Sequence, residues 1–176
     1  MIRKSNPYHD ERGRFTFGAG GLSVGSRLRC GGKTYTIKRA IPTKTGRVVF
    51  AAYNRREREE DENIGVCEIL IVKLGWTCVL LPRSSVLGEK TADMMRVEDK
   101  TKWEIKTSYS GNPQTISKAL QKASKQATNA IVKIVCKDSV NMEAIKKAAR
   151  NRKALTKLEK IMFIVDENIS FLDDED

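Results

Sequence analysis

The chain has few of the residues on which several common kinds of site depend. His9 is the only histidine among the 176 residues. This excludes sites that need two histidines, and because His9 lies in a polar segment typical of an exposed linker, neither a histidine-dependent triad nor a zinc site is expected. The cysteines show no C-x-x-C spacing, so buried free thiols are expected rather than a zinc site or a disulfide framework. The cysteines are Cys30, Cys67, Cys78 and Cys136.

Long apolar runs and aromatic side chains are also scarce. No run approaches the roughly 18 consecutive apolar residues of a membrane-spanning helix, and the N-terminus has no apolar segment typical of a signal peptide. Aromatic residues make up 6% of the chain. Trp76 and Trp103 lie in runs typical of a core, which leaves Tyr109 as the aromatic residue nearest the motif described next. Because readers of single-stranded bases usually offer several stacking rings, recognition of backbone shape and charge is expected.

Two carboxylates and an amine stand close together in the run TADMMRVEDKTKWEIKTS. Residues 94–97 and 101–107 are predicted to be strands joined by a charged turn, and Glu104 and Lys106 then share one face of the second strand. Asp93 and Glu104 are the oxygen ligands that Mg²⁺ or Mn²⁺ prefers, and Lys106 would orient a water or stabilise charge on a phosphate. An ordinary solvated Glu-x-Lys pair would show the same pattern.

The net charge of +11 is unevenly distributed along the chain. Residues 1–60 and 114–160 each carry a net +9, from 14 basic and 5 acidic side chains and from 12 and 3, whereas residues 61–113 carry −1 and residues 161–176 carry −6. Basic regions that flank a metal motif favour a nucleic acid as partner, although a solvated helix face shows similar charge. The best candidates for phosphate contacts recur at helical spacing: Lys118, Lys122 and Lys125.

The rest of the chain alternates helical and strand patterns typical of an α/β fold. Residues 63–74 have apolar side chains at helical spacing, with Gly75 as the expected C-cap. Short apolar runs predict buried strands. In chain order, the elements expected after the first helix are strands over 76–81, 94–97 and 101–107, a helix over 114–130, a strand over 131–136, a basic helix and a strand over 161–165.

This order of helix, three strands, helix and strand resembles the PD-(D/E)XK nuclease superfamily, with its restriction-endonuclease-like core. Residues 68–164 look more narrowly like the C-terminal tRNA nuclease toxin domain of CdiA-type contact-dependent growth inhibition proteins. The motifs that carry the resemblance are Leu74-Gly75, Val79 to Pro82, Asp93, Trp103 to Lys106, and Gln126-Ala127. Ala92 stands where the name of the superfamily places proline.

The resemblance implies a set of site residues. Asp93 and Glu104 would ligate Mg²⁺ or Mn²⁺, and Lys106 would be the catalytic lysine. Glu68, from the first helix, matches a carboxylate that many members use as a further catalytic contact, and a surface glutamate is the alternative. Gln126 matches a helix position that often faces the site and substrate.

The N-terminal third of the chain has a different pattern. Residues 1–21 are polar and rich in glycine and arginine, so a flexible leader is expected. Residues 22–56 contain short alternating runs around Gly31-Gly32 and predict a small three-stranded β module. The nuclease-like domain would then cover residues 57–169, and residues 170–176 would form a disordered acidic tail.

Together these observations predict a metal-dependent endonuclease with no membrane span. The resemblance implies a bacterial polymorphic toxin that cleaves tRNA in the cytoplasm, is delivered from a secreted or cell-surface parent protein, and has a cognate immunity protein. Two alternatives remain at this point: a phage or mobile-element DNA endonuclease, and a nucleic-acid-binding module with inert carboxylates.

Overall fold

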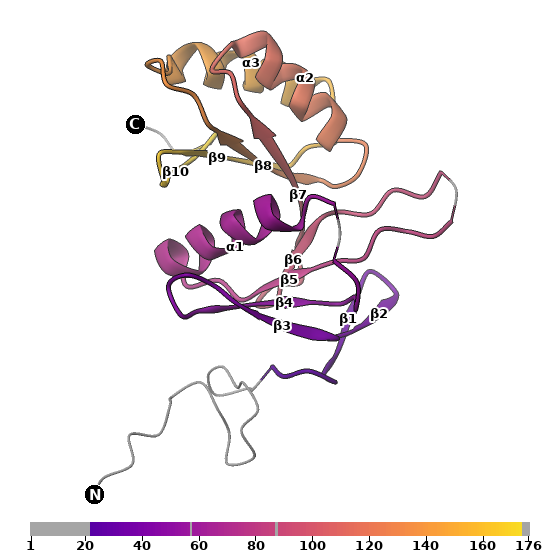
Figure 1. Cartoon of the computed structure of the whole chain (residues 1–176). Helices are drawn as coiled ribbons and strands as arrows, with labels where there is room; N and C mark the ends of the chain where they lie inside the picture. The colour runs from indigo at the N-terminus through magenta and orange to yellow at the C-terminus, as the bar shows by residue number, and fades with distance from the viewer. Residues whose placement is uncertain (1–21, 57, 87, 174–176) are drawn as a thin grey trace, which may run out of the picture.

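The computed structural model describes residues 22–173 except residues 57 and 87. The expected leader therefore lies outside the described residues, as do residues 174–176. The described part forms an α/β fold (Figure 1). Its helices are α1 (Glu60–Leu74), α2 (Pro113–Ala123) and α3 (Met142–Ala154). Its strands are β1 (Arg27–Cys30), β2 (Lys33–Thr36), β3 (Arg39–Pro42), β4 (Val48–Ala51), β5 (Cys78–Leu80), β6 (Met94–Arg96), β7 (Lys102–Ser108), β8 (Asn129–Ile134), β9 (Lys160–Val165) and β10 (Asn168–Phe171).

One mixed sheet of eight strands organises the molecule, in the order β10-β9-β8-β7-β6-β5-β4-β3. Strands β7, β8 and β9 are parallel, whereas β5, β6 and β7 form an antiparallel meander. The predicted order of helix, three strands, helix and strand is confirmed by α1, β5 to β7, α2 and β8. The crossovers from β7 to β8 and from β8 to β9 carry α2 and α3, which pack together on the sheet.

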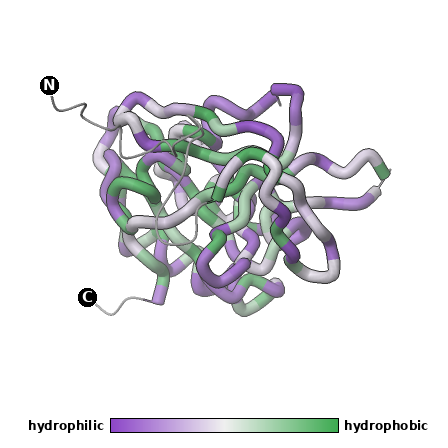
Figure 2. Tube along the Cα trace, turned by 90° about the horizontal axis from the view of Figure 1, so that it is seen from below, coloured by the Kyte–Doolittle hydropathy of each residue, from purple (hydrophilic) through white to green (hydrophobic). Residues whose placement is uncertain are grey.

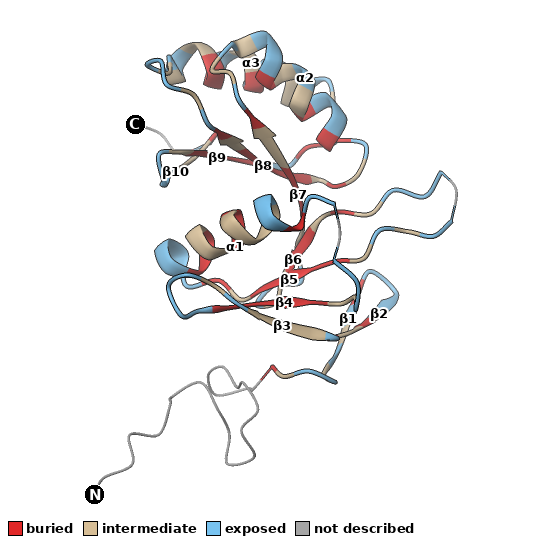
Figure 3. Ribbon diagram, viewed as in Figure 1, coloured by how far each residue is buried: buried red, intermediate tan, exposed pale blue. Residues whose placement is uncertain are grey.

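The sheet is covered on both faces. In β8, Ile131 packs into a core with residues of α1, and its neighbour Val132 packs into a second core with residues of α2 and α3. Successive side chains of a strand point to opposite faces, so α1 covers one face and α2 with α3 cover the other. Buried residues accordingly follow the strands and the inner sides of the helices (Figure 3). None of the described helices is long and apolar enough to span a lipid bilayer.

The segment predicted as a separate three-stranded module is divided between two sheets. Strands β1 and β2 form the expected hairpin, with Gly31 and Gly32 at φ 57° and 76° in its turn. Strands β3 and β4, however, belong to the main sheet, where β4 pairs in parallel with β5. All four residues of β4 are buried, and a strand that is apolar on both faces needs cover on both sides. The predicted domain boundary at residue 56 therefore does not separate two sheets.

Two further boundaries differ from the prediction. Helix α2 ends at Ala123 instead of residue 130, because residues 129–134 are recruited by the parallel pairing of β8 with β7. The predicted tail begins inside β10, which forms a hairpin with β9 through Asp166 and Glu167 at positive φ. Leu172, just after β10, is buried. The Gly75 cap of α1 is confirmed by its left-handed conformation, φ 66°.

A partly buried ion pair connects β3 to α1. Glu60 is 4% exposed, and its carboxylate accepts a 2.6 Å hydrogen bond from Arg39 Nη2. Replacing Arg39 with methionine leaves this carboxylate without its main partner, so we expect the free energy of unfolding to fall by about 2 to 3 kcal/mol in urea denaturation. Arg29→Met, at an exposed position of β1, is the matched control and should cost less than about 0.5 kcal/mol. Equal effects of the two changes would show that the pair does not contribute to stability.

Candidate active site

The antiparallel pairing of β6 and β7 places Asp93 beside Glu104. Asp93 immediately precedes β6, and Met94 pairs with Trp103 of β7. The backbone N–H of Ile105 donates a 2.8 Å hydrogen bond to Asp93 Oδ2. The Asp93 carboxylate is thereby held against the strand that carries Glu104.

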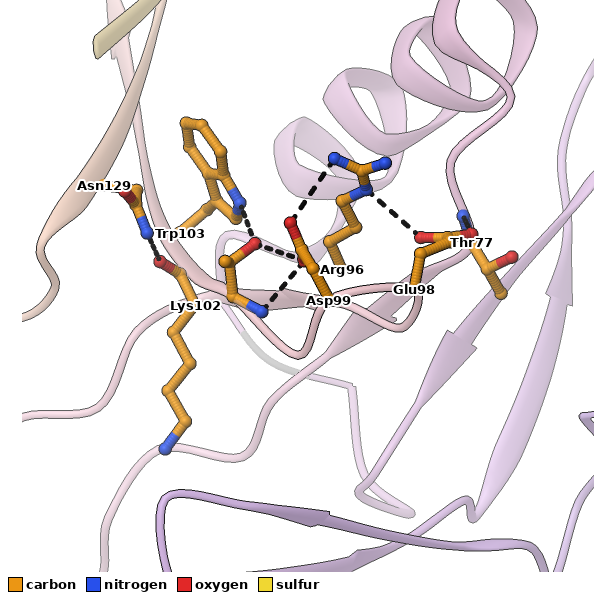
Figure 4. Close-up of polar contacts among 8 residues, drawn as sticks. Thr77, Arg96, Glu98, Asp99, Lys102, Trp103 and Asn129 are labelled. Atoms are coloured by element: carbon orange, nitrogen blue, oxygen red, sulfur yellow. Dashed lines mark hydrogen bonds and ion pairs between the residues drawn. The ribbon is translucent and has the colours of Figure 1, made fainter. Parts of the chain in front are cut away.

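Polar contacts at the β6–β7 turn brace this hairpin (Figure 4). Asp99 Oδ1 accepts hydrogen bonds from the backbone N–H and the hydroxyl of Thr101, at 3.1 and 2.7 Å. Trp103 Nε1 donates to the same hydroxyl at 2.9 Å, and Asn129 Nδ2 of β8 donates to the Lys102 carbonyl at 3.0 Å. The turn that joins β6 to β7, at the end of the hairpin opposite Asp93, is therefore fixed by side chains as well as by the strand ladder.

Glu104 lies at the centre of the site. Its residue is fully buried, and its Oε1 accepts hydrogen bonds from Lys106 Nζ and Gln126 Nε2. Its other oxygen, Oε2, is buried and has no hydrogen-bond partner. The structure thus brings together Asp93, Glu104, Lys106 and Gln126, as the sequence predicted. Gln126 reaches the site from the turn after α2 and not from the helix itself.

The charge of Asp93 disfavours the ionised form of the Glu104 carboxyl group. Burial, and after it the charge of Asp93, raise the pKa of Glu104 to about 8 against the opposing effect of Lys106. Burial also raises the pKa of Asp93, although the hydrogen bond from Ile105 and the charge of Lys106 oppose this shift. Such a pair gains most from a cation that neutralises both groups.

The carboxylates open into a cleft of about 360 Å³, hereafter the cleft. Its lining mixes four carboxylates with three cationic side chains, beside two hydroxyls and one amide. The residues are Glu59, Arg83, Ser84, Glu89, Lys90, Thr91, Asp93, Glu104, Lys106 and Gln126. Several of them come from the segment between β5 and β6, which projects from the body of the molecule (Figures 1 and 2).

One carboxylate in the cleft was not predicted from the sequence. It belongs to Glu59, the residue just before α1. Its Oε2 accepts a 3.1 Å hydrogen bond from Arg83 Nη2. The acidic run ahead of α1 was the available signal, but the helix was predicted to start at residue 63 and begins at Glu60. The run of residues 55–63 is compatible with a charged connection or with the first turns of the helix, and its residues from Glu60 on form the first turn of α1.

Glu68, predicted as a catalytic residue, does not lie in the cleft. Its carboxylate accepts a 2.7 Å hydrogen bond from the backbone N–H of Thr45. It lines a different cavity of about 320 Å³ together with Lys44, Lys73 and Lys133. Glu68 follows Glu59 by nine residues. In an α-helix this spacing corresponds to about two and a half turns and a rise of about 13 Å, so the two side chains point in nearly opposite directions. Glu68 therefore faces away from the cleft that Glu59 reaches.

A second hollow, of about 510 Å³, lies between β7 and α2 and adjoins the cleft. It is called the groove below. Its lining includes three lysines and no carboxylate, and Lys106 lines both the groove and the cleft. The residues are Lys106, Thr107, Ser108, Tyr109, Ser110, Thr115, Lys118, Ala119 and Lys122. Of the three lysines predicted to contact phosphates, the structure places Lys118 and Lys122 in the groove. Lys125 is exposed and lines neither hollow.

The donor set in the cleft fits a hard divalent cation. Mg²⁺ is commonly held by one or two carboxylates and otherwise by water and phosphate oxygens. The unpartnered Glu104 Oε2 beside the Asp93 carboxylate provides such a pair. Among the residues that the structure describes, no three His, Cys, Asp or Glu side chains form a group that could hold an ion. A cation here would complete its shell with water or substrate oxygens.

Comparison with models of known protein families gives no match for this chain. Comparison with curated proteins gives none either. Among solved structures, the chain is similar to one described as a CdiA-CT/CdiI toxin and immunity complex from Burkholderia pseudomallei. The two share 20% sequence identity and a TM-score of 0.47, over 76% of this chain and 96% of the other.

Proposed function

We propose that this protein is a metal-dependent nuclease that hydrolyses phosphodiester bonds. The observation that carries the proposal is the convergence of Asp93, Glu104 and Lys106 in one cleft that continues into a basic groove. Carboxylates can bind a cation and lysines can bind phosphates. The cleft and the groove together therefore suit a nucleic-acid strand with one phosphodiester bond at the carboxylates and the neighbouring phosphates along the lysines.

Asp93 and Glu104 are the proposed ligands of Mg²⁺ or Mn²⁺. The bound ion would lower the pKa of a water and neutralise charge that builds up on the phosphate. Gln126 holds Glu104 Oε1 through its amide and so leaves Oε2 for the ion. Lys106, held by the same Oε1, orients the attacking water or stabilises a phosphate oxygen.

The preference for RNA over DNA, and for tRNA, rests on the sequence resemblance to CdiA-type toxin domains. On the same ground we infer a polymorphic toxin effector that acts in the bacterial cytoplasm after delivery from a larger parent protein. Such an effector requires a cognate immunity protein. The net charge of +11 favours an acidic surface on that partner.

Cleavage assays with two substrates test this proposal. Purified tRNA and supercoiled plasmid are incubated with the protein in Mg²⁺ or in EDTA. We expect tRNA to be cleaved in Mg²⁺ and to stay intact in EDTA, because the two carboxylates lack a cation there. Cleavage of the plasmid alone would replace the toxin with a DNA endonuclease, and cleavage of neither substrate would contradict the nuclease.

A further inference from the structure

One exposed aromatic side chain stands in the basic groove. Tyr109 follows β7 directly and is 70% exposed. Its hydroxyl donates a 2.9 Å hydrogen bond to Glu62 Oε1 of α1. The ring is therefore held at one end while most of its surface faces solvent.

The backbone around Tyr109 is also held in place. Ser108 Oγ donates to the Ser110 carbonyl at 2.8 Å and accepts from the Ser110 N–H at 3.3 Å. The Asn112 N–H donates to Ser110 Oγ at 3.1 Å, and the Asn112 side chain caps α2. A side chain fixed in this way loses little conformational entropy when a ligand binds to it.

Charge changes sign between the cleft and the groove. The cleft contains four carboxylates, whereas the groove contains Lys106, Lys118 and Lys122 without an acidic residue in its lining. A nucleic-acid strand with its reacting phosphate at the carboxylates would lay its neighbouring phosphates along these lysines. Tyr109 lies five residues beyond Glu104, about 17 Å along an extended strand, so a nucleotide a few positions from the reacting phosphate would lie beside Tyr109.

We propose that Tyr109 is a stacking platform for an unpaired base and that the groove binds a single-stranded segment next to the bond that is cut. This inference rests on the proposed nuclease function and names its substrate class. Every base has a flat face that stacks on an aromatic ring, and such stacking contributes about 1 to 3 kcal/mol per base. Bases inside a duplex stack on one another and offer no free face. The groove volume of about 510 Å³ lies in the usual range of small-ligand sites.

Binding assays in an inactive background test this inference separately from cleavage. The Glu104→Gln protein in EDTA is titrated into a fluorescently labelled ten-nucleotide RNA, the same sequence as DNA, and the RNA duplex, with anisotropy as the readout. Tyr109→Ala should weaken binding of both single strands about tenfold and leave duplex binding within twofold. Tyr109→Phe keeps the ring and should retain single-strand binding. Leu155→Ala, at another exposed apolar position, is the matched control and should change nothing.

The inference would be overturned by unchanged single-strand binding in Tyr109→Ala, by an equal loss for duplex and single strands, or by an equal loss in Tyr109→Phe and Tyr109→Ala. The last result would assign the effect to the contact with Glu62 and not to the ring. The inference also fails if none of the three probes binds to the protein. If tRNA is cleaved while Tyr109→Ala binds normally, only the platform fails. Loss of single-strand binding in Tyr109→Ala without any cleavage by the unmodified protein removes the nuclease instead.

Discussion

Replacing Glu104 with glutamine is expected to reduce the rate of tRNA cleavage on the order of a thousandfold. Glutamine keeps the size of the side chain, and its carbonyl oxygen still accepts from Lys106 and Gln126, as Oε1 of Glu104 does. It lacks the negative charge that a divalent cation requires. Initial rates at saturating Mg²⁺ measure the effect, and circular dichroism checks that the fold is retained. Asp93→Asn should cause a loss of similar size, because it also removes a negative charge from the proposed cation site. The amide oxygen still accepts from the Ile105 N–H, so the contact with β7 is kept.

Glu68→Gln is the matched control for this experiment. It makes the same chemical change on α1, in a cavity separate from the cleft. Its activity should stay within about twofold of the unmodified protein. An equal loss in Glu68→Gln, or full activity in Glu104→Gln, would contradict the assignment of the cleft as the active site.

Stability in metal-free buffer is expected to fall as the pH rises from 5 to 9, mainly because of Glu104. The pKa of Glu104 is about 8 in the folded protein and near the ordinary value of 4.5 in the unfolded chain. Between these values the folded state holds a proton that the unfolded state has released. The contribution of Glu104 to stability is therefore greatest below pH 4.5 and is lost as the pH rises through 8, by a difference on the order of 4 kcal/mol. The raised pKa of Asp93 acts in the same direction.

Urea denaturation of wild type and Glu104→Gln at pH 5, 7 and 9, in EDTA, measures this dependence. The glutamine variant has no charge to bury at this position, so its stability should change less with pH and should exceed that of wild type at pH 9. Glu68→Gln should keep the wild-type slope, because the hydrogen bond from Thr45 and the charge of Lys44 outweigh burial and lower the pKa of Glu68. A Glu104→Gln protein that is less stable than wild type at pH 9 would contradict a buried-charge cost at the site.

The part of the site on β6 and β7 was predictable from local sequence. Alternation in the run around Glu104 and Lys106 places both side chains on one face of a strand, and a short turn returns the chain beside Asp93. The shared strand face and the hairpin both depend on residues close in sequence, and both are present in the folded structure. Gln126 was also identified, although the turn that carries it was predicted as helix.

The contribution of α1 was not predictable in the same way. Glu59 and Glu68 are both glutamates at the start of or within one helical segment, and nothing in their local sequence distinguishes the one that reaches the cleft. The packing of α1 against the sheet sets the rotation of the helix and thereby selects Glu59. Likewise, the partner of the buried strand β4 was decided by long-range pairing with β5.

The sequence by itself determined the order of helices and strands, the capping of α1 by Gly75 and the grouping of two carboxylates with a lysine. Hydrophobic period and turn chemistry act over a few residues, so they can be recognised along the chain. Tertiary structure decided that β3 and β4 extend the main sheet, that Glu68 is excluded from the cleft, and that Tyr109 stands exposed in a basic groove. These outcomes depend on which distant surfaces bury one another, and that choice is made by the packing of the whole core.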